Sequence, residues 1–256
     1  MYDLPLPDNL RYIEPGDTGF SGERKRTGMS DSNEKAPEHS SSDAVPKAVV
    51  SRLSLYLREL QHLQQEGSTT TSSTQLGRLL GLTDAQVRKD LAYFGQFGYP
   101  GIGYRCDELI AKIREILGTN REWPVVLVGV GNLGRALLGY RGFGQQGFKV
   151  VAAFDKDADK TGRPIEGVPV HGIDALEEIV RSRGIQLAII AVPGQEAQNV
   201  AEKLVAAGVV GVLNFAPVTL SLPSEVSMIG VDLAMELESL TFAVANRAGC
   251  QNRVGS

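Results

Sequence analysis

Several features are scarce in this chain of 256 residues, and each scarcity excludes a class of protein. Its two cysteines, Cys106 and Cys250, are too few for a disulfide framework or a cysteine-rich zinc cluster. No apolar run approaches the roughly 18 residues that cross a bilayer. The N-terminus has no basic stretch followed by an apolar one, so we expect no secretory signal. We therefore expect a cytoplasmic protein that binds neither a membrane nor a metal.

Positive charge is not in excess over the whole chain, which has 26 Lys and Arg against 30 Asp and Glu and a net charge of −4. A nucleic-acid surface must therefore be local. Residues 1–46 hold 5 basic against 9 acidic side chains, residues 47–122 hold 10 against 8, and residues 123–256 hold 11 against 13. Only the middle segment is basic, and we expect nucleic-acid contacts there.

The two ends of the chain differ in composition from the middle. Residues 1–45 are rich in Gly, Ser, Asp and Pro and lack a sustained apolar period, so burial cannot offset the entropy lost on ordering. We expect a disordered extension there and a flexible tail over residues 247–256. The basic run Arg24–Arg26 either contacts DNA phosphates or, as is more common for so short a run, is only solvated.

Residues 46–120 are expected to form a small helical DNA-binding domain. Apolar side chains recur at helical spacing in four stretches that are separated by turn residues. The expected helices run from Val49 to near Gly67, over 75–81, over 84–94 and over 107–117, with a helix-turn-helix over about 56–95.

Capping residues support these helices. Ser72 or Ser73 precedes the second helix, and Gly118 ends the fourth. Thr83 and Gln86 have the spacing of a capping box, in which each side chain bonds the backbone N–H of the other. These signals place a short turn between the second and third helices.

The third helix has the two faces of a recognition helix in a major groove. Val87, Leu91 and Phe94 lie on the face expected in the core, whereas the opposite face is polar and basic. Arg and Lys suit guanine and phosphate oxygens, and Gln suits adenine. The alternative for the third helix is an ordinary surface helix with one Arg-Lys pair and no ligand. Residues 95–104 alternate aromatic residues with Gly and predict a small β-wing, which could touch phosphates or the minor groove. The candidate DNA contacts are Gln86, Arg88, Lys89, Tyr93, Tyr99, Tyr104 and Arg105.

Residues 121–231 alternate strands and helices. Continuous β-branched apolar runs are typical of parallel strands buried on both faces. The expected strands cover 125–129, 149–155, 187–192, 211–216 and 226–232, and the expected helices cover 132–140, 174–183 and 195–208. This order predicts an α/β fold with a doubly wound parallel sheet of the Rossmann type, placed after the N-terminal winged helix.

A glycine fingerprint follows the first of these strands. Gly129 permits a tight turn, Gly131 lets the backbone approach a pyrophosphate, and Gly134 lets the next helix pack closely on the strand. Phosphates would bind the N–H groups at the start of that helix. The loop residues expected to hold a dinucleotide are Gly129, Val130, Gly131, Asn132, Leu133 and Gly134.

Asp155 lies 21 residues after Gly134, at the end of the second strand, where an acid hydrogen-bonds a ribose hydroxyl. A carboxylate there repels a 2′-phosphate, so NAD(H) is favoured over NADP(H), although the neighbouring Lys156 weakens this preference. The alternative is a structural turn beside an acidic strand end. Tyr140, at the end of the helix, is expected near the nicotinamide or in a packing role.

An enzymatic use of this site lacks an obvious acid or base. Dehydrogenases need a proton donor near the hydride acceptor, and the three histidines are His39 in the extension, His62 in the first helix and His171 in an expected loop. Two alternatives stay open: an NAD-dependent dehydrogenase, and a CoA- or nucleotide-binding subunit that would use His171. A redox role for Cys106 also stays open, against the more common incidental thiol.

The segments SSTQLGRLLGLTDAQVRKDLAYFGQFGYPGIGY, VVLVGVGNLGRALLGY and VDLAMELESL resemble the Rex family of redox-sensing transcriptional repressors, over about residues 46–246. The resemblance implies a non-enzymatic homodimer with an N-terminal winged helix and a C-terminal Rossmann domain. It implies binding to palindromic operators of genes for respiration, fermentation and NADH reoxidation. NADH would release the protein from DNA and NAD+ would permit binding, so NAD(H) would be a regulatory ligand that is not turned over.

The resemblance also assigns roles to single residues. Arg88 and Lys89 match the family's DNA-contacting pair, and the glycine loop with the following acid matches its coenzyme site. Arg58, Tyr140 and Asp232 match positions that link the DNA domain, the nicotinamide end and the last helix. Asp232 would pair with Tyr140 in one state and with Arg58 in the other, or it is simply a helix cap.

The last expected helix, residues 232–246, has no strand after it to hold it on the sheet. The resemblance implies that this helix is exchanged between the two subunits as a dimerisation element. The N-terminal extension and the tail RAGCQNRVGS are not family features, and Asn132 stands where some relatives carry Arg. The apolar residues of the helix are Leu233, Leu237, Leu240, Phe242 and Val244.

Overall fold

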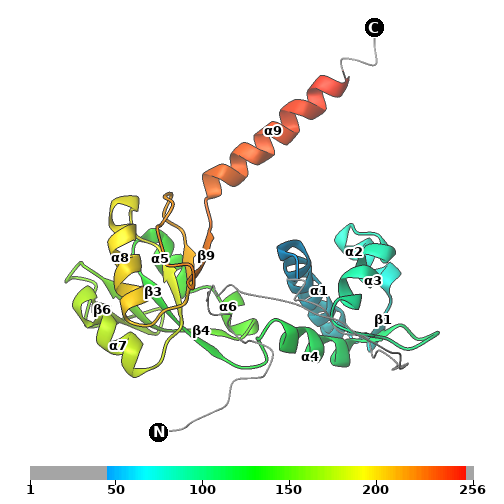
Figure 1. Ribbon diagram of the computed structural model, residues 1–256, viewed down its shortest axis with the longest axis horizontal. Helices are drawn as coiled ribbons and strands as arrows, with labels where there is room; N and C mark the ends of the chain where they lie inside the picture. Colours follow the sequence, from blue (N-terminus) through cyan, green and yellow to red (C-terminus); the bar gives the residue numbers. More distant parts are fainter. Residues whose placement is uncertain (1–44, 252–256) are drawn as a thin grey trace, which may run out of the picture. The chain divides into compact units, whose positions relative to one another are not determined.

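A computed structural model describes residues 45–251 of the chain (Figure 1). The expected disordered extension up to residue 44, the Arg24–Arg26 run and residues 252–256 lie outside the described part. The first described segment forms four helices and a two-stranded sheet. Its elements are α1 (Lys47–Gln65), β1 (Thr70–Thr71), α2 (Ser73–Leu80), α3 (Asp84–Ala92), β2 (Tyr104–Arg105) and α4 (Cys106–Ile116).

These helices pack around an apolar core that the helical spacing predicts. The apolar side chains of α1 from Val49 to Leu63 that share one face are buried. Val87 and Leu91 of α3 are 0% and 2% exposed, and Phe94 packs against the same cluster. One face of α3 is therefore anchored in the core, which leaves the opposite face in solvent.

The caps of α2 and α3 confirm part of the expected capping pattern. Ser72, rather than Ser73, caps α2, because its Oγ accepts the backbone N–H three residues later at 3.1 Å. Thr83 Oγ1 accepts the Gln86 N–H at 3.1 Å at the start of α3. The Gln86 side chain does not return to Thr83, since its Nε2 donates to Asp90 at 2.7 Å. The prediction of a reciprocal capping box is therefore wrong in its second half.

The β-wing consists of β1 and β2, which pair antiparallel with Thr71 opposite Tyr104. The glycine-rich segment predicts the wing, but β1 escapes prediction because two threonines are too short a run to show strand periodicity. The Tyr99 N–H donates to the Gly103 carbonyl at 2.7 Å and closes the turn of the wing. Gly103 has φ +89°, and a Cβ there would collide with the Thr71 carbonyl, so only glycine fits.

The second described segment contains a seven-stranded sheet in the order β5–β6–β4–β3–β7–β8–β9. All neighbouring strands are parallel except β5 and β6. Counting the parallel strands along the chain gives the order 3-2-1-4-5-6 of a doubly wound dinucleotide-binding fold, which confirms the expected fold class. The strands are β3 (Trp123–Val128), β4 (Phe148–Asp155), β5 (Pro164–Ile165), β6 (Val168–Gly172), β7 (Leu187–Ile190), β8 (Gly211–Asn214) and β9 (Ser227–Gly230).

The helices between these strands include every one that the sequence predicts and one that it does not. The unpredicted helix α6 and the unpredicted strand β5 are both short, and β6 covers the strand-like run before His171. The expectation that His171 lies in a loop is wrong, because it belongs to β6 and lies opposite Phe154 of β4. The helices are α5 (Asn132–Leu138), α6 (Gly142–Gln145), η1 (Ile173–Ala175), α7 (Leu176–Ser182) and α8 (Gly194–Ala206).

Both faces of the sheet carry apolar side chains, as the continuous apolar runs predict. Val126 and Val128 belong to a cluster that includes residues of α7 and α8. Val125 and Leu127 belong to the opposite cluster, with residues of α5 and Phe143 of α6. This second face keeps an apolar hollow of about 360 Å³, which we call the sheet hollow. It is lined by Val125, Phe143, Phe148, Val150, Leu187, Ala188, Ile189, Gly211, Val212, Leu213, Ser227 and Ile229.

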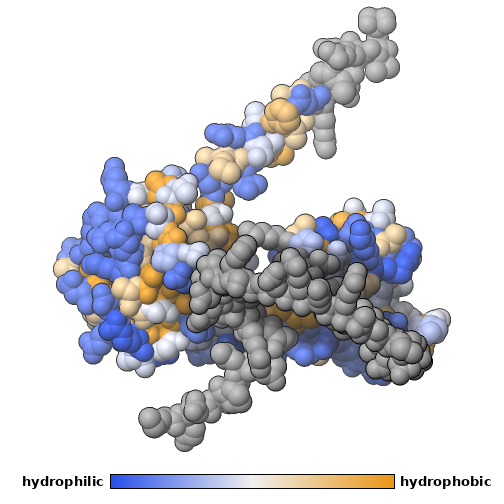
Figure 2. All heavy atoms as spheres, in the orientation of Figure 1, coloured by the Kyte–Doolittle hydropathy of each residue, from blue (hydrophilic) through white to orange (hydrophobic). Residues whose placement is uncertain are grey.

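The last helix, α9 (Leu233–Gln251), exposes its large apolar side chains between Leu233 and Val244, and Phe242 is 73% exposed. Figure 2 shows these apolar residues as orange and tan spheres along the helix. The helix continues to Gln251, beyond residue 246 where the expected last helix ends, and a flexible tail stays a prediction. Within residues 45–251, no helix is both long enough and apolar enough to cross a bilayer.

Candidate functional site

The loop after β3 gives Gly129 and Gly134 the backbone roles that their spacing predicts and leaves open space at Gly131. Gly129 has φ +98°, and a Cβ there would lie 2.5 Å from the Ala191 carbonyl oxygen. A Cβ at Gly134 would collide with the Gly129 carbonyl, so α5 packs directly against the turn. A Cβ at Gly131 would meet no atom within 4 Å. The space beside Gly131 is therefore open for a ligand, whereas the other two glycines serve the fold.

A cavity of about 430 Å³ lies beside this loop. It is lined by Gly129 and Gly131, by Asp155 at the end of β4, and by residues of α8. The strand order reverses between β3 and β7, and the crevice at such a point binds nucleotides in doubly wound folds. We call this space the coenzyme cavity.

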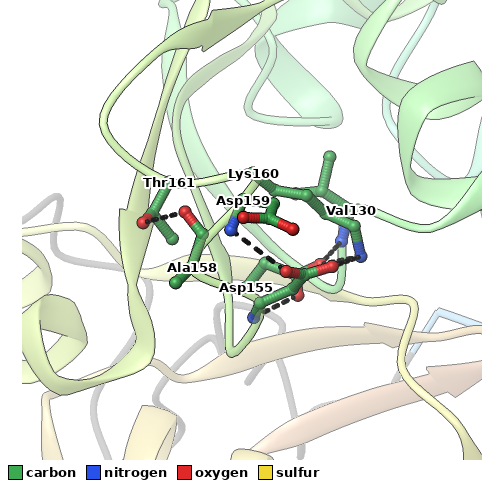
Figure 3. Close-up of polar contacts among 7 residues, drawn as sticks. Val130, Asp155, Ala158, Asp159, Lys160 and Thr161 are labelled. Carbon is green, nitrogen blue, oxygen red and sulfur yellow. Dashed lines mark hydrogen bonds and ion pairs between the residues drawn. The ribbon is translucent and has the colours of Figure 1, made fainter.

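Asp155 is buried beside the loop and is held by three donors (Figure 3). Its Oδ2 accepts the Val130 N–H at 2.7 Å, and its Oδ1 accepts the Asp157 N–H at 2.9 Å. Lys160 Nζ lies 3.3 Å from Oδ2. Burial alone would raise the pKa of Asp155, but these hydrogen bonds outweigh it and hold the pKa below its ordinary value. An ionised acceptor thus stands where the fingerprint predicts one.

Two of the expected coenzyme contacts, Val130 and Lys156, are already bonded to other residues of the chain. The Val130 N–H is already bonded to Asp155, so it is not free for a phosphate. Lys156 is exposed at the rim of the coenzyme cavity and pairs with Glu196 of α8 at 2.8 Å. That pairing holds the Lys156 ammonium against α8, although its charge still interacts with Asp155. The N–H groups of Asn132 and Leu133, in the first turn of α5, remain candidates for phosphate contact.

The expected switch residues lie apart from one another. Tyr140 is 59% exposed, and the edge of its ring packs on Phe143 with centroids 5.0 Å apart. Arg58 is exposed on α1. Asp232 Oδ1 accepts the Ala234 N–H at 2.9 Å, so it caps α9. No hydrogen bond joins the three among the residues that the structure describes, and the switch stays a prediction.

The outer face of α3 presents most of the expected DNA contacts to solvent. Lys89 and Tyr93 are exposed, and no ion pair holds Lys89 within the described chain. The Arg88 guanidinium is 55% exposed and bonds Asp84 at 2.8 Å and Ser73 at 3.1 Å. These contacts hold Arg88 against α2, at the turn of the helix-turn-helix.

The wing places two of its three expected contacts on the surface. Tyr99 is 49% exposed and donates to Glu108 at 3.1 Å, and Arg105 lies 3.3 Å from the same carboxylate. The expectation that Tyr104 decorates the wing surface is wrong. Its ring belongs to the apolar core and is only 9% exposed, because the antiparallel register of β1 and β2 turns it inward.

The sequence analysis missed one buried carboxylate, Asp90 of α3. It is fully buried and bonds Arg52, Tyr56 and Gln86. A signal for it exists, since Asp90 lies three positions after Val87 and therefore on the core face of α3. A carboxylate on a core face requires partners, and α1 offers an Arg and a Tyr one turn apart.

Of two residues held open for chemistry, Cys106 is buried and His171 is half-buried. Burial raises the pKa of the Cys106 thiol, which is 1% exposed, so its reactive thiolate form is disfavoured. His171 Nε2 is buried without a hydrogen-bond partner, and its ring lies 5.9 Å from that of Phe154. Within residues 45–251, no group of three or more His, Cys, Asp or Glu side chains is placed to hold a metal ion.

Two family models match the chain. One, described as "Putative DNA-binding protein N-terminus", covers residues 44–92, and the other, described as "CoA binding domain", covers residues 120–218. The helical part through α3 and the Rossmann-type sheet from β3 to β8 thus match separate models, and residues 93–119 between them belong to neither match.

Curated relatives named redox-sensing transcriptional repressor Rex are similar over most of their length. The protein of Carboxydothermus hydrogenoformans is 50% identical over 200 residues, which is 78% of this chain and 96% of the relative. The protein of Desulfitobacterium hafniense is 47% identical over 203 residues, which is 79% of this chain and 97% of the relative.

Solved structures extend the similarity to the fold. RSP, a Rex-family repressor, in complex with β-NAD+ and operator DNA, is 31% identical with a TM-score of 0.76, covering 84% of this chain and 99% of that one. RSP with β-NADH is 30% identical with a TM-score of 0.74, and the match covers 82% of this chain and 99% of that one. Sequence identity, coverage and fold agree, and the chain belongs to the Rex family of redox-sensing transcriptional repressors.

Proposed function

We propose that this chain is a homodimeric repressor that binds palindromic operator DNA and leaves it when NADH is bound. One observation carries the proposal: a solvent-facing basic helix α3 and a glycine-loop cavity beside the buried Asp155 occur in one chain. The first can read DNA, and the second can hold a dinucleotide. The genes controlled would be those of respiration, fermentation and NADH reoxidation, as the family resemblance implies.

The coenzyme cavity offers a place for each polar part of NAD(H). The open space at Gly131 lets a pyrophosphate approach the backbone, where the Asn132 and Leu133 N–H groups can donate. The ionised Asp155 can accept from a ribose hydroxyl, and it would repel the 2′-phosphate of NADP(H). We therefore propose NAD(H) as the ligand.

Sensing requires that the two redox forms bind the two protein states unequally, because a ligand with equal affinity for both states shifts nothing. When bound, the coenzyme supplies a nicotinamide ring that is positively charged if oxidised and neutral if reduced. Tyr140 has a largely exposed aromatic face, and we propose that it covers the neutral ring. The release of DNA would follow from the rearrangement that this contact stabilises.

Dimerisation through α9 explains two exposed apolar surfaces. The sheet hollow is almost wholly apolar, and the large apolar side chains of α9 from Leu233 to Val244 are exposed. Removing apolar surface from water stabilises a protein by about 25 cal/mol per Å². Covering either of these two surfaces with a partner is therefore favourable. We propose that α9 is exchanged between two copies of the chain, and that the two copies place their α3 helices on the two halves of a palindrome.

Asp232 supports the proposed switch by its position. It lies at the first turn of α9 and is half-buried, so a movement of that helix would change its partner. We propose that it bonds Tyr140 in one state and Arg58 in the other. Replacement of Arg58 or Asp232 by Ala should change NADH-driven release while the protein still folds. Release that matches the wild type in both variants would contradict the switch.

We propose a regulatory rather than a catalytic use of the cavity, because the curated relatives are named repressors. In the described chain no histidine lines the coenzyme cavity, and Tyr140, which we propose to cover the nicotinamide, is not among its lining residues. The lysines at the cavity are Lys156, paired with Glu196, Lys160, paired with Asp155, and Lys203. We propose no enzymatic activity, and a place in the cytoplasm with the chromosomal DNA that it binds.

The test is an operator-binding titration at fixed total nicotinamide with a varied NADH fraction. The full-length protein should bind a duplex that it has selected from a random pool when NAD+ dominates. Its affinity should fall steeply as the NADH fraction rises, with no NADH consumed. Equal affinity at every NADH fraction would refute the proposal, and consumption of NADH would favour a dehydrogenase.

A further inference from the structure

A buried ion-pair network ties the recognition helix α3 to α1. The Asp90 carboxylate accepts four hydrogen bonds. Arg52 donates two of them, from Nη2 to Oδ1 at 2.8 Å and from Nε to Oδ2. Tyr56 Oη donates the third to Oδ2 at 2.7 Å, and Gln86 Nε2 donates the fourth to Oδ1 at 2.7 Å. Asp90 thus faces donors only.

This network fixes which end of the Gln86 amide points outward. Burial alone would raise the pKa of Asp90, but the hydrogen bonds from Arg52, Tyr56 and Gln86 outweigh it and keep the carboxyl ionised. An ionised carboxylate can only accept, so an amide beside it must present its nitrogen. The nitrogen of Gln86 therefore turns toward Asp90, and its Oε1 turns away.

Gln86 lies where a recognition helix reads bases. It is in the first turn of α3, and the N-terminal residues of such a helix meet base edges. It is half-buried, so its outer end remains accessible. An outward oxygen accepts from the exocyclic amine of adenine or cytosine in the major groove, whereas guanine and thymine present carbonyl oxygens there.

We propose that Asp90 is a positioning residue that sets the base preference of the helix by holding Gln86 with its oxygen outward. On the strand that Gln86 contacts, adenine or cytosine is then preferred over guanine or thymine at one position of each half-site. This inference rests on the proposed function, because it requires that α3 reads operator DNA. It adds a specificity determinant that never touches a base itself.

The experiment measures base preference rather than total affinity. Full-length wild type selects a duplex from a random pool, and the affinity for each base pair at each position is then measured by competition. Gln86→Ala identifies the position that depends on Gln86. At that position the wild type should prefer adenine or cytosine by about tenfold, in line with discrimination of about 1–3 kcal/mol for a good base contact.

Asp90→Asn tests the positioning role. An amide at position 90 can donate as well as accept, so the Gln86 amide can turn either end outward. The preference should fall below about threefold, against the wild-type discrimination expected for a fixed side chain. Preferences at positions read by other residues should persist. A wild-type preference retained in the Asp90→Asn protein would overturn the proposal.

Two matched variants separate positioning from general loosening. Tyr56→Phe removes one donor to Asp90 but leaves an ionised acceptor, so the base preference should be unchanged even if stability falls. Glu115→Gln alters an exposed carboxylate of α4 that pairs with Lys112 and should change nothing. A preference lost equally in the Tyr56→Phe protein would show loosening and overturn the proposal.

A test on the wild type alone applies if Asp90→Asn does not fold. The selected duplex is made with an analogue that lacks the exocyclic amine, purine for adenine or pyrimidin-2-one for cytosine. Wild type should lose about tenfold in affinity, and Gln86→Ala should be indifferent. Indifference of the wild type would overturn this inference alone if NADH still releases the protein. Selection of no duplex at all would overturn the proposed function with it.

Discussion

At the scale of single residues, the Asp90 carboxylate is the least replaceable polar group of the helical part. Removing one partner of a buried pair leaves an uncompensated charge, which costs about 3–5 kcal/mol. Because Arg52 is 24% exposed and water can reach Asp90 once it is gone, we expect Arg52→Ala to cost about 3 kcal/mol, near the lower end of that range. Urea unfolding followed by circular dichroism measures this, and a loss below about 0.5 kcal/mol, as for an ordinary surface change, would contradict it.

The lowered pKa of Asp90 also predicts an acid dependence. A carboxyl whose pKa is lower in the folded state stabilises the fold above its ordinary pKa of about 3.9, and this contribution is lost as the pH falls through the folded value. The free energy of unfolding of wild type should therefore approach that of Asp90→Asn below about pH 4. Urea titrations of both proteins from pH 7 to pH 3 measure the gap. If the difference in the free energy of unfolding between the two proteins grew as the pH fell, the pKa of Asp90 would be raised rather than lowered in the folded state.

The glycines of the coenzyme loop allow a paired test. Gly131→Ala adds a Cβ that meets nothing, so stability should change by less than about 0.5 kcal/mol, while NADH affinity should fall at least about tenfold. Gly134→Ala instead forces a Cβ against the Gly129 carbonyl and should destabilise by about 1–3 kcal/mol, the range for overpacking. Thermal unfolding and NADH fluorescence separate the two. Equal NADH affinity in Gly131→Ala and wild type would remove Gly131 from the site.

The glycine spacing predicts the geometry of the coenzyme loop, whereas the helical spacing indicates only that Asp90 is buried and not which residues of α1 it bonds. Gly129, Gly131 and Gly134 act through the backbone at fixed spacing, and their roles follow from the missing Cβ. Asp90 acts through partners 34 and 38 positions away, which spacing within one helix cannot identify. The inward turn of Tyr104 likewise depends on pairing with β1, a strand too short to recognise.

At the scale of elements, α9 makes a prediction about assembly. Its exposed apolar face should bind a second copy, so Leu237→Asp together with Leu240→Asp should give a monomer. Sedimentation velocity at micromolar concentration measures the mass. Glu238→Gln, a polar change on the same exposed helix, should leave the dimer intact. A dimer that persists in the double variant would place the interface elsewhere.

Long periodic elements were predictable from sequence, and short ones were not. The helix α1 repeats one apolar period over 19 residues, and the eight-residue strand β4 is a long continuous apolar run, so chance matches are rare. The elements β5 and α6 have two and four residues, below the length at which a period can be recognised. The continuation of α9 to Gln251 was missed because its sequence beyond residue 246 is no longer apolar.

At the scale of the whole molecule, function depends on coupling between two separate binding activities. Linkage makes such coupling reciprocal: if NADH weakens operator binding by some factor, operator must weaken NADH binding by the same factor. Couplings of this kind are typically about 5–150-fold. The fold class and both activities follow from the sequence, but the coupling is a property of two states and their free-energy difference.

The most direct measurement of that coupling is a titration of NADH, followed by its fluorescence, with the full-length protein alone and with saturating operator duplex. We expect the dissociation constant for NADH to rise at least about fivefold when operator is present, and that for NAD+ to change in the opposite direction or not at all. The same NADH affinity with and without operator would contradict the account.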